Sequence, residues 1–452
     1  MMKRLLRGGW LAMALALLLS CGGGGGGGVG VAGSGGGSSY GVVAGGGDFA
    51  KGGSGDGAGG ATPGAGDGTA SGAGDGSTST ASNGDGSGVG SGGTGVTSAS
   101  AVGVGSVDGF GSVIVNGLRY DVEGAAISVE DAPGLEIGMT ARVVGAVDAG
   151  FATGVAKEIS SAAELRGPVT SVDESAGTLL VMGTTVSTDS STVWAGSLTF
   201  PGMAAGTVLQ VWGLPASPGV LRATRIAQVG EPAAPIVTGR VEQLDRAAQV
   251  FRLGGLQVDY RAAAVAMGGN AATLANGAIV RVRASQAPVH GFLTASLVQS
   301  WYDHASPAGT TALLEGVIDD YAGPGAFRVL DTTVDASAAK ITGGPGTSAL
   351  GNGVKVIVGG TFDSSGRLVA TTLKIRHVPG TGGPAAFMLI GTVANYDSPA
   401  RFRVRGQPVD ASGADVVFEN GAAADLRNGV KVTVAGARVV EGVLIATQLR
   451  FD

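Results

Sequence analysis

Apolar and polar residues alternate in short runs from about residue 101 to the end of the chain. The clearest run is Leu-x-x-Gly followed by alternating apolar residues, which reads LEIGMTARV (135–143), LANGAIVRV (274–282), LGNGVKVIV (350–358), LRNGVKVTV (426–434) and, in a degenerate form, MAAGTVLQV (203–211). A period of two is typical of a β-strand with one buried face. In the last copy it predicts that Val430, Val432 and Val434 point inward while Lys431 and Thr433 face outward.

Other elements recur in the same order around each of these blocks. Each copy opens with Gly-x-Val or Gly-x-Ile and continues with two alternating runs joined by a turn. The pairs Asn116-Gly117 and Gly254-Gly255 are typical of the type I′ turn of a β-hairpin. The glycines of the blocks lie 68, 71, 76 and 76 residues apart, which indicates five repeated units.

Each unit therefore reads strand, hairpin, short strand, helical turn, strand, strand. We expect the helical turn because small and polar residues precede the block, whose glycine would end the turn in the left-handed conformation. This order matches the five-stranded OB-type barrel, and a small β-sandwich is the alternative. We predict an all-β fold, a tandem array of five small OB-like β-barrels at residues 101–163, 164–232, 233–305, 310–379 and 385–452.

The segment before the units has a different composition. Residues 22–100 hold 35 of the 86 glycines, and Ser, Thr, Ala and Asp fill most of the rest. Such a segment buries too little apolar surface to offset the entropy of ordering it. Gly-Asp-Gly triplets occur in it, but without the nonapeptide spacing of calcium-binding repeats. We predict that residues 21–100 are a disordered, Gly-rich tether.

The chain begins with features of an export signal. Three basic residues lie within the first seven positions, and an apolar run from Trp10 to Leu19 follows. That run is shorter than the roughly 20 residues of a transmembrane helix and has the length of a signal-peptide core. We predict that residues 1–20 are a signal peptide.

The end of this signal, Leu18-Leu19-Ser20-Cys21, resembles the lipobox of bacterial lipoproteins. The resemblance implies cleavage before Cys21 and attachment of lipid, palmitate included, to that cysteine. Glycine follows at positions 22 and 23, where an aspartate would favour the inner membrane, so the resemblance implies an outer-membrane anchor. An ordinary signal peptide with an incidental Cys21 is the alternative.

The lipobox, the Gly-rich segment and the tandem units together resemble the bacterial domain family of unknown function number 5666. The motif is Gly-x-Val, then Val-x-Val-Asn-Gly, then Leu-x-x-Gly-x-x-Val-x-Val-x-Gly, and the resemblance covers about residues 101–452. It is strongest in the first, fourth and fifth copies and weakest in the second. The resemblance implies small β-barrels in secreted or lipid-anchored proteins, and it carries over no catalytic residue. It therefore reports fold and not chemistry.

Composition and charge narrow the function classes. One cysteine and three histidines exclude a disulfide scaffold and make a histidine-rich or multi-cysteine metal site unexpected. The formal charge of −6, which becomes about −9 once the signal is removed, and four tryptophans argue against nucleic-acid binding. We expect no cofactor, no metal and no nucleic acid. The expected partners are a membrane, through the lipid anchor, and an envelope polysaccharide or protein.

Two clusters could bind a ligand. In the last unit, Arg401, Arg403 and Arg405 alternate with Phe402 and Val404, which places three guanidinium groups on one strand face. They could hold phosphates or uronates, or they could form a solvated face that discourages edge pairing. A smaller version of the pattern occurs at positions 281 and 283, which are both arginine.

The second cluster is Trp301-Tyr302-Asp303-His304, at the join of the third and fourth units. Its rings could stack on a sugar, or they could pack against the neighbouring barrel. The chain has no nucleophile-elbow, zincin or P-loop motif. We therefore expect a lipid-anchored envelope protein that acts as a non-catalytic, multivalent binding or spacer array. The alternatives are a polysaccharide- or lipopolysaccharide-binding surface module and an enzyme whose site is assembled from loops.

Overall fold

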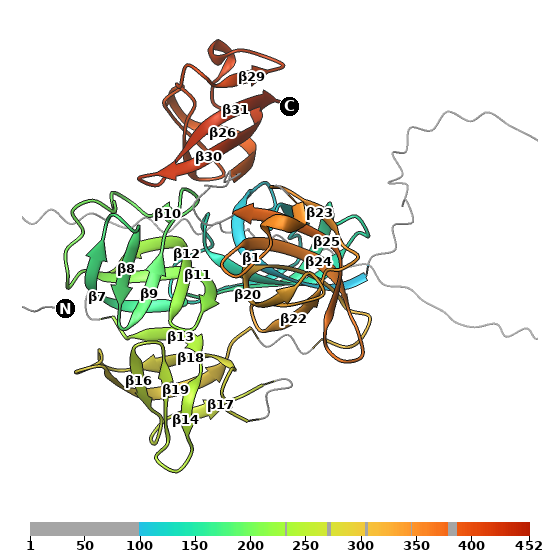
Figure 1. The fold of residues 1–452 in the computed structure, drawn as a ribbon. Coiled ribbons are helices and arrows are strands. Elements are labelled where there is room, and N and C mark those ends of the chain that lie inside the picture. Colours follow the sequence, from blue (N-terminus) through green and yellow to red (C-terminus); the bar gives the residue numbers. More distant parts are fainter. Residues whose placement is uncertain (1–98, 231–232, 269–272, 303–305, 345, 378–386) are drawn as a thin grey trace, which may run out of the picture. The chain divides into compact units, whose positions relative to one another are not determined.

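The computed structural model describes residues 99–230, 233–268, 273–302, 306–344, 346–377 and 387–452 (Figure 1). The predicted signal peptide, Cys21 and the Gly-rich segment lie outside these residues. Within them the chain is all-β, with strands throughout and two short 3₁₀ turns. No helix of the described residues is long and apolar enough to cross a membrane.

The first unit is a closed barrel. Its strands are β1 (Ala99–Phe110), β2 (Val113–Val115), β3 (Leu118–Asp121), β4 (Ala126–Val129), β5 (Thr140–Val147) and β6 (Thr153–Ser161). β1 pairs with β2, β2 with β3, β3 in parallel with β6, β6 with β5, and β5 with β1 again. The short β4 adds to β6 in parallel. A circuit of five strands with one parallel pair is the OB-type barrel that the sequence predicts, and its closure excludes the sandwich alternative.

The same circuit recurs in four further units. Unit 2 contains β7 (Leu165–Asp173), β8 (Thr178–Val181), β9 (Thr184–Ser187), β10 (Val193–Trp194), β11 (Val208–Ser217) and β12 (Val220–Gln228). Unit 3 contains β13 (Ile236–Arg240), β14 (Glu242–Asp245), β15 (Val250–Leu253), β16 (Leu256–Asp259), β17 (Ala264–Ala266), β18 (Ile279–Ala284) and β19 (Phe292–Ser300).

Unit 4 contains β20 (Thr311–Gly323), β21 (Ala326–Val329), β22 (Thr332–Asp335), β23 (Lys340–Thr342), β24 (Lys355–Phe362) and β25 (Leu368–His377). Unit 5 contains β26 (Phe387–Ser398), β27 (Arg401–Val404), β28 (Gln407–Asp410), β29 (Val417–Glu419), β30 (Lys431–Val440) and β31 (Val443–Phe451). The tandem array of small OB-like barrels is thus confirmed.

The Leu-x-x-Gly block takes the predicted backbone but not always the predicted helical turn. Its five glycines have φ between 84° and 90°, the left-handed region that glycine adopts at little cost: Gly138, Gly206, Gly277, Gly353 and Gly429. A 3₁₀ turn precedes the block in unit 4 (Gly346–Ala349) and unit 5 (Ala423–Asp425). The described residues of units 1 and 2 contain none, so a helical turn in every unit is wrong. The left-handed glycine makes a tight turn there without a preceding helix.

The hairpin turns differ in detail. Asn116 and Gly117 both have positive φ, 60° and 75°, as the predicted type I′ turn requires. At Gly254-Gly255 only the first residue has positive φ, which is the type II′ pattern, so the predicted type there is wrong. The cause is packing, because the Gly255 N–H donates to the Gly183 carbonyl of unit 2 at 3.0 Å.

The inward pattern of the last block is confirmed. Val432 and Val434 are fully buried, whereas Lys431 is exposed. Thr433 is half-buried beside them, and its hydroxyl bonds the Asp452 carboxylate. Leu426 lies in the same core, which fits its place at the start of the block.

The units share sheets and cores. β1 of unit 1 runs parallel to β20 of unit 4 over four residue pairs, and it also meets β26 of unit 5. β7 of unit 2 pairs with β13 of unit 3, and the two units bury one common apolar core. Barrels that are distant in sequence therefore contact one another, and polar groups at these contacts build the candidate site.

Candidate functional site

A cavity of about 470 Å³ opens between unit 1 and the end of unit 3. One wall comes from β1, β4, β5 and β6, and the other comes from Gly268 and the stretch from Ser300 to Tyr302. The volume lies within the roughly 300–1,000 Å³ of typical small-molecule sites. Two other hollows of the described chain have only about 10 Å³ each.

The unit 1 wall carries a row of polar side chains in register. Ser128 of β4 lies opposite Ser160 of β6, and Ser160 lies opposite Arg142 of β5. Arg142 in turn lies opposite Val104 of β1. All four line the cavity, because residues paired across adjacent strands project on the same side of a sheet. The strand alternation that buries Ala141 and Val143 in the barrel thus turns this row outward.

Three members of this row have no protein partner in the described structure. Neither the hydroxyl groups of Ser128 and Ser160 nor the guanidinium of Arg142 makes a hydrogen bond or ion pair with another described residue. Their neighbours are satisfied: Ser161 donates to the Thr140 carbonyl at 2.7 Å. The row therefore offers two free hydroxyls and one free cation to the cavity.

Glu164 lies at the base of the cavity, between β6 and β7. It is 1% exposed, and its Oε1 accepts from the Tyr302 hydroxyl and, at 3.4 Å, from Thr140 Oγ1. Burial raises the pKa of Glu164 to about 7, although Tyr302 and the charge of Arg281 act in the opposite direction. Burial, with the charge of Glu164, also raises the pKa of Tyr302 well above its usual value. Tyr302 therefore stays a neutral donor.

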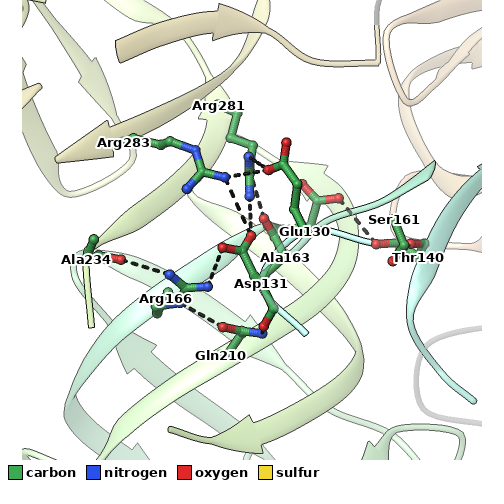
Figure 2. A network of polar contacts seen from close by, with 11 residues as sticks. Glu130, Asp131, Thr140, Ser161, Ala163, Arg166, Gln210, Ala234, Arg281 and Arg283 are labelled. Carbon is green, nitrogen blue, oxygen red and sulfur yellow. Dashed lines mark hydrogen bonds and ion pairs between the residues drawn. The ribbon is translucent and has the colours of Figure 1, made fainter. Parts of the chain in front are cut away.

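Arg281 of β18 lies fully buried beside the cavity (Figure 2). Its Nη1 bonds Glu130 at 2.9 Å, its Nη2 bonds Asp131 at 2.8 Å, and its Nε donates to the Ala163 carbonyl at 2.9 Å. The guanidinium also lies 4.8 Å from the ring centroid of Trp301, which is a cation–π distance. A cation of unit 3 is thus held by three groups of unit 1 and fixes one face of the Trp301 ring.

Asp131 connects three units. Besides Arg281, it binds Arg166 of unit 2 at 2.5 Å, and Arg283 approaches it at 3.6 Å. Gln210 of unit 2 bonds both its backbone carbonyl, at 2.8 Å, and Arg166, at 2.7 Å. Burial alone would raise the pKa of Asp131, but the surrounding arginines outweigh it and hold that pKa below the usual range. The carboxylate therefore remains charged and joins the units.

A second polar junction joins units 1 and 4. Glu315 of β20 is fully buried, pairs with Lys355 at 3.0 Å and accepts from the backbone N–H and hydroxyl of Ser106, both at 2.7 Å. Asp108 accepts from the Gly117 N–H at 2.8 Å and lies 3.4 Å from Arg376. Burial raises the pKa of Asp108 to about 6. The hollow beside it has only about 10 Å³, so these groups bind each other and leave no room for a ligand.

The two clusters predicted from the sequence have different environments. Trp301 and Tyr302 both line the cavity, in an edge-to-face arrangement with ring centroids 6.1 Å apart. In unit 5, Arg401 pairs with Asp397 at 2.5 Å, and Arg403 donates to the Gly406 carbonyl. Arg405 lies in the turn after β27, with φ of 54°, and donates to the Ile390 carbonyl at 3.2 Å.

The structure thus does not align the three arginines of unit 5 on one strand. Arg405 leaves the strand because the turn needs two residues of positive φ, and each of the three guanidiniums has a local acceptor. The smaller arginine pattern, at positions 281 and 283, also differs from the prediction, because Arg281 is buried between units and does not lie on a free surface. Cys21, Asp303 and His304 lie outside the described residues.

The sequence patterns do not predict most of the residues that line the cavity. Glu164 and the serines stand in runs with no motif, and Arg142 is an outward position of the first Leu-x-x-Gly block, whose pattern says nothing about a ligand. Glu130 and Asp131 are adjacent acids before a proline, a pattern that predicts a surface loop and no contact with an arginine of another unit. Only the Trp301-Tyr302 pair indicated the location.

Comparisons with known proteins agree on the repeats. The model of a family described as "Domain of unknown function (DUF5666)" matches residues 166–227, 238–299, 315–374 and 390–450, which are units 2 to 5. The second copy, expected to be the weakest, is among the matched copies, whereas the first copy, expected to be among the strongest, is not matched. The matched residues begin after unit 1.

A search of curated proteins finds no match. Among solved structures, a chain described as drosophila Unr CSD456 matches with 12% identity and a TM-score of 0.13, over 47% of this chain and 97% of that chain.

Proposed function

This chain belongs to the family of domains of unknown function DUF5666, and we propose that it is a non-catalytic binding protein of the bacterial cell envelope. Its ligand would occupy the cavity between units 1 and 3. Its tether would end at a lipid on Cys21, in the outer membrane. Its partners would be an envelope polysaccharide or an envelope protein.

The observation that carries the proposal is the row of unpartnered polar groups on the cavity wall. Ser128, Ser160 and Arg142 face a hollow of ligand size from three adjacent strands. Ser128 and Arg142 are exposed and Ser160 is half-buried, so all three groups are open to an outside partner in the cavity. Trp301 and Tyr302 supply the aromatic wall that such sites commonly have.

The cavity groups support binding better than catalysis. Glu164 and Tyr302 converge, but the carboxyl is occluded, and its Oε1 already accepts from Tyr302 and Thr140. The nearest serine with a partner, Ser161, donates to a backbone carbonyl rather than to a base. A catalytic nucleophile needs a hydrogen bond to a base, and that base needs a hydrogen bond to a third group that orients it. The described residues of the cavity do not form such a series of hydrogen bonds.

The membrane anchor rests on the sequence. The basic start, the short apolar run and the single cysteine at the position the lipobox requires support lipidation of Cys21. At least two lipid attachments would hold such a protein stably. The Gly-rich segment would then separate the barrels from the membrane.

A spacer role is the second candidate. The ion pairs of Asp131 join units 1, 2 and 3, and the hydrogen bonds from Ser106 to Glu315 join units 1 and 4, so these barrels contact one another directly. This would suit a scaffold that holds a fixed geometry in the envelope.

A ligand panel on the full chain, purified in detergent, tests the proposal. Thermal stability is measured with neutral and acidic glycans, lipid headgroups and peptides, for the native chain and for Ser128→Tyr, which fills the cavity mouth. The matched control is Val417→Tyr, an exposed position on the corresponding short strand of unit 5. We expect at least one ligand class to stabilise the native chain and the control but not Ser128→Tyr. Stabilisation by no class, or equal stabilisation of all three, would leave only the spacer role.

A further inference from the structure

Resting on the proposed binding function, we infer that the cavity recognises a sugar acid, a pyranose unit that carries one carboxylate. Three features of the walls lead to this class: one unpaired cation, free hydroxyls beside it, and an aromatic ring across from it.

The charge balance favours a single negative charge on the ligand. Glu130 and Asp131 are matched by Arg166, Arg281 and Arg283, so their charges are already satisfied. Arg142 is the one arginine or lysine among the residues that line the cavity, it has no counter-ion in the described chain, and it is exposed. Its planar fork can hold a carboxylate through two parallel hydrogen bonds. A neutral ligand would leave this cation unused.

The same balance disfavours a phosphate. A phosphate dianion would need more than one guanidinium or a set of backbone N–H donors, and the cavity wall supplies neither. A monoanion, which one guanidinium can balance, therefore fits this cavity better.

The hydroxyl groups favour a sugar over a simple acid. Ser160 lies between Arg142 and Ser128 in the strand register, so the cation has a free hydroxyl next to it and a second one strand further. Each serine hydroxyl can both donate and accept, as the hydroxyls of a sugar ring do. A uronate presents its carboxylate and ring hydroxyls in one rigid unit, which matches a row of this kind.

The opposite wall suits the ring itself. Trp301 is held by Arg281 at 4.8 Å and by the edge-to-face contact with Tyr302. A fixed aromatic ring with a negatively polarised face attracts the C–H groups of a pyranose. The cavity volume of about 470 Å³ leaves space for a small saccharide between the two walls.

Calorimetric titration of the full chain in detergent tests the inference. The probes are the methyl glycoside of galacturonic acid, which carries one carboxylate, its neutral methyl ester of nearly the same shape, and inorganic phosphate. We expect the acid to bind about tenfold or more tightly than the ester, because a hydrogen bond between two charged groups is stronger than one to a neutral ester. Phosphate should bind more weakly than the acid.

Two variants locate the effect. Arg142→Gln should lower the affinity for the acid to that for the ester and leave the ester unchanged. Arg119→Gln, an exposed arginine of the same barrel outside the cavity, should change neither. Circular dichroism of both variants checks that they fold.

The outcomes separate the two proposals. Equal binding of acid and ester, tighter binding of phosphate, or an Arg142→Gln variant that binds the acid normally would overturn the sugar-acid class. In each of these cases a ligand that Ser128→Tyr excludes would still support the binding function. If no probe binds, the class is wrong, and the wider panel then decides whether the cavity binds anything.

Discussion

At the residue scale, Arg281 of β18 is a fully buried cation that joins unit 3 to Glu130 and Asp131 of unit 1. Alternation in β18 correctly predicts a strand, but it cannot say what covers its outer face. Arg281 was therefore expected on a surface and is buried against Glu130, Asp131 and Trp301. Its partners come from 150 residues or so earlier in the chain, and no local pattern encodes such a contact.

The first prediction concerns the buried arginine. Arg281→Ala should lower the free energy of unfolding by about 3–5 kcal/mol, because it leaves buried acceptors without their cation. Arg283→Ala, two residues along the same strand, should cost less than about 1 kcal/mol, since its side chain and that of Glu130 are 28% and 52% exposed. Chemical denaturation measures both. Equal losses would mean that Arg281 does not hold the junction.

The second prediction concerns pH. The folded pKa of Glu164, about 7, exceeds its ordinary value of 4.5, so the folded chain holds this proton more tightly than the unfolded chain. The stabilisation is complete below about pH 4.5 and is lost as the pH rises through 7, for a total of about 3 kcal/mol. Relative to Glu164→Gln, the native chain should lose that amount between pH 4.5 and pH 8.

Denaturation curves at the two pH values give this difference. Glu123→Gln, at an exposed position of the same unit, is the control and should follow the native chain. If Glu164→Gln also follows the native chain at both pH values, the carboxyl does not titrate as its burial requires.

At the element scale, the sequence predicted much more. Hairpins, strand faces and the left-handed glycines follow from local rules, because a turn and a period of two need only neighbouring residues. The helical turn failed in units 1 and 2 for the same reason: small residues permit a helix, but a left-handed glycine needs none before it. The type II′ turn at Gly254 follows from a contact with unit 2, which local rules cannot contain.

The third prediction compares two equivalent glycines. Gly138 and Gly429 have φ of 84° and 89°, so alanine at either position should cost about 1–2 kcal/mol from the backbone alone. A methyl group at 429 would meet nothing within 4 Å, whereas one at 138 would lie 2.8 Å from Thr224 O and Val193 Cγ2 of unit 2.

Gly138→Ala should therefore lose about 1–3 kcal/mol more than Gly429→Ala in denaturation experiments. Equal losses would indicate that unit 2 moves away from the turn at no cost. The comparison separates two requirements: the positive φ that both glycines share, and the space beside unit 2 that only Gly138 needs.

At the scale of the whole molecule, the sequence predicted the number and kind of barrels but not their contacts. The circuit of each barrel is local, while the pairing of β1 with β20 joins segments about 200 residues apart. The cavity depends on these distant contacts, which is why two of its aromatic residues were found from the sequence and its polar row was not.

The fourth prediction concerns the anchor. Cys21→Ser removes the thiol that lipidation needs, so most of the protein should move from the membrane to the soluble fraction of bacterial cells. Fractionation followed by immunoblotting measures this. Serine at position 20 changed to alanine is the control and should leave the protein in the membrane. Unchanged membrane association of Cys21→Ser would remove lipid anchoring from the proposed function.

The last prediction follows from the unequal contacts of the units. Unit 1 supplies the carboxylates for Arg166, Arg281 and Arg225, and its β1 pairs with β20 of unit 4. Unit 5 covers only a few side chains outside itself, chiefly Ile137 and Val193. Deleting residues 99–163 therefore removes these ion pairs, the pairing of β1 with β20, and the apolar contacts of Trp212, Leu313 and Ile357 with unit 1, whereas ending the chain at 377 exposes only a few apolar groups worth about 1.5–3 kcal/mol each.

At roughly 2–4 °C per kcal/mol, the first deletion should lower the melting temperature of the remaining barrels by about 10 °C or more, and the second by only several degrees. Differential scanning calorimetry of both shortened chains, beside the full chain, gives the comparison. Independent barrels would respond alike to the two deletions, because each would lose only its own unfolding transition. A larger loss on deletion of unit 1 would mean that the first barrel stabilises the other barrels through its contacts. The family model matches only the other four barrels.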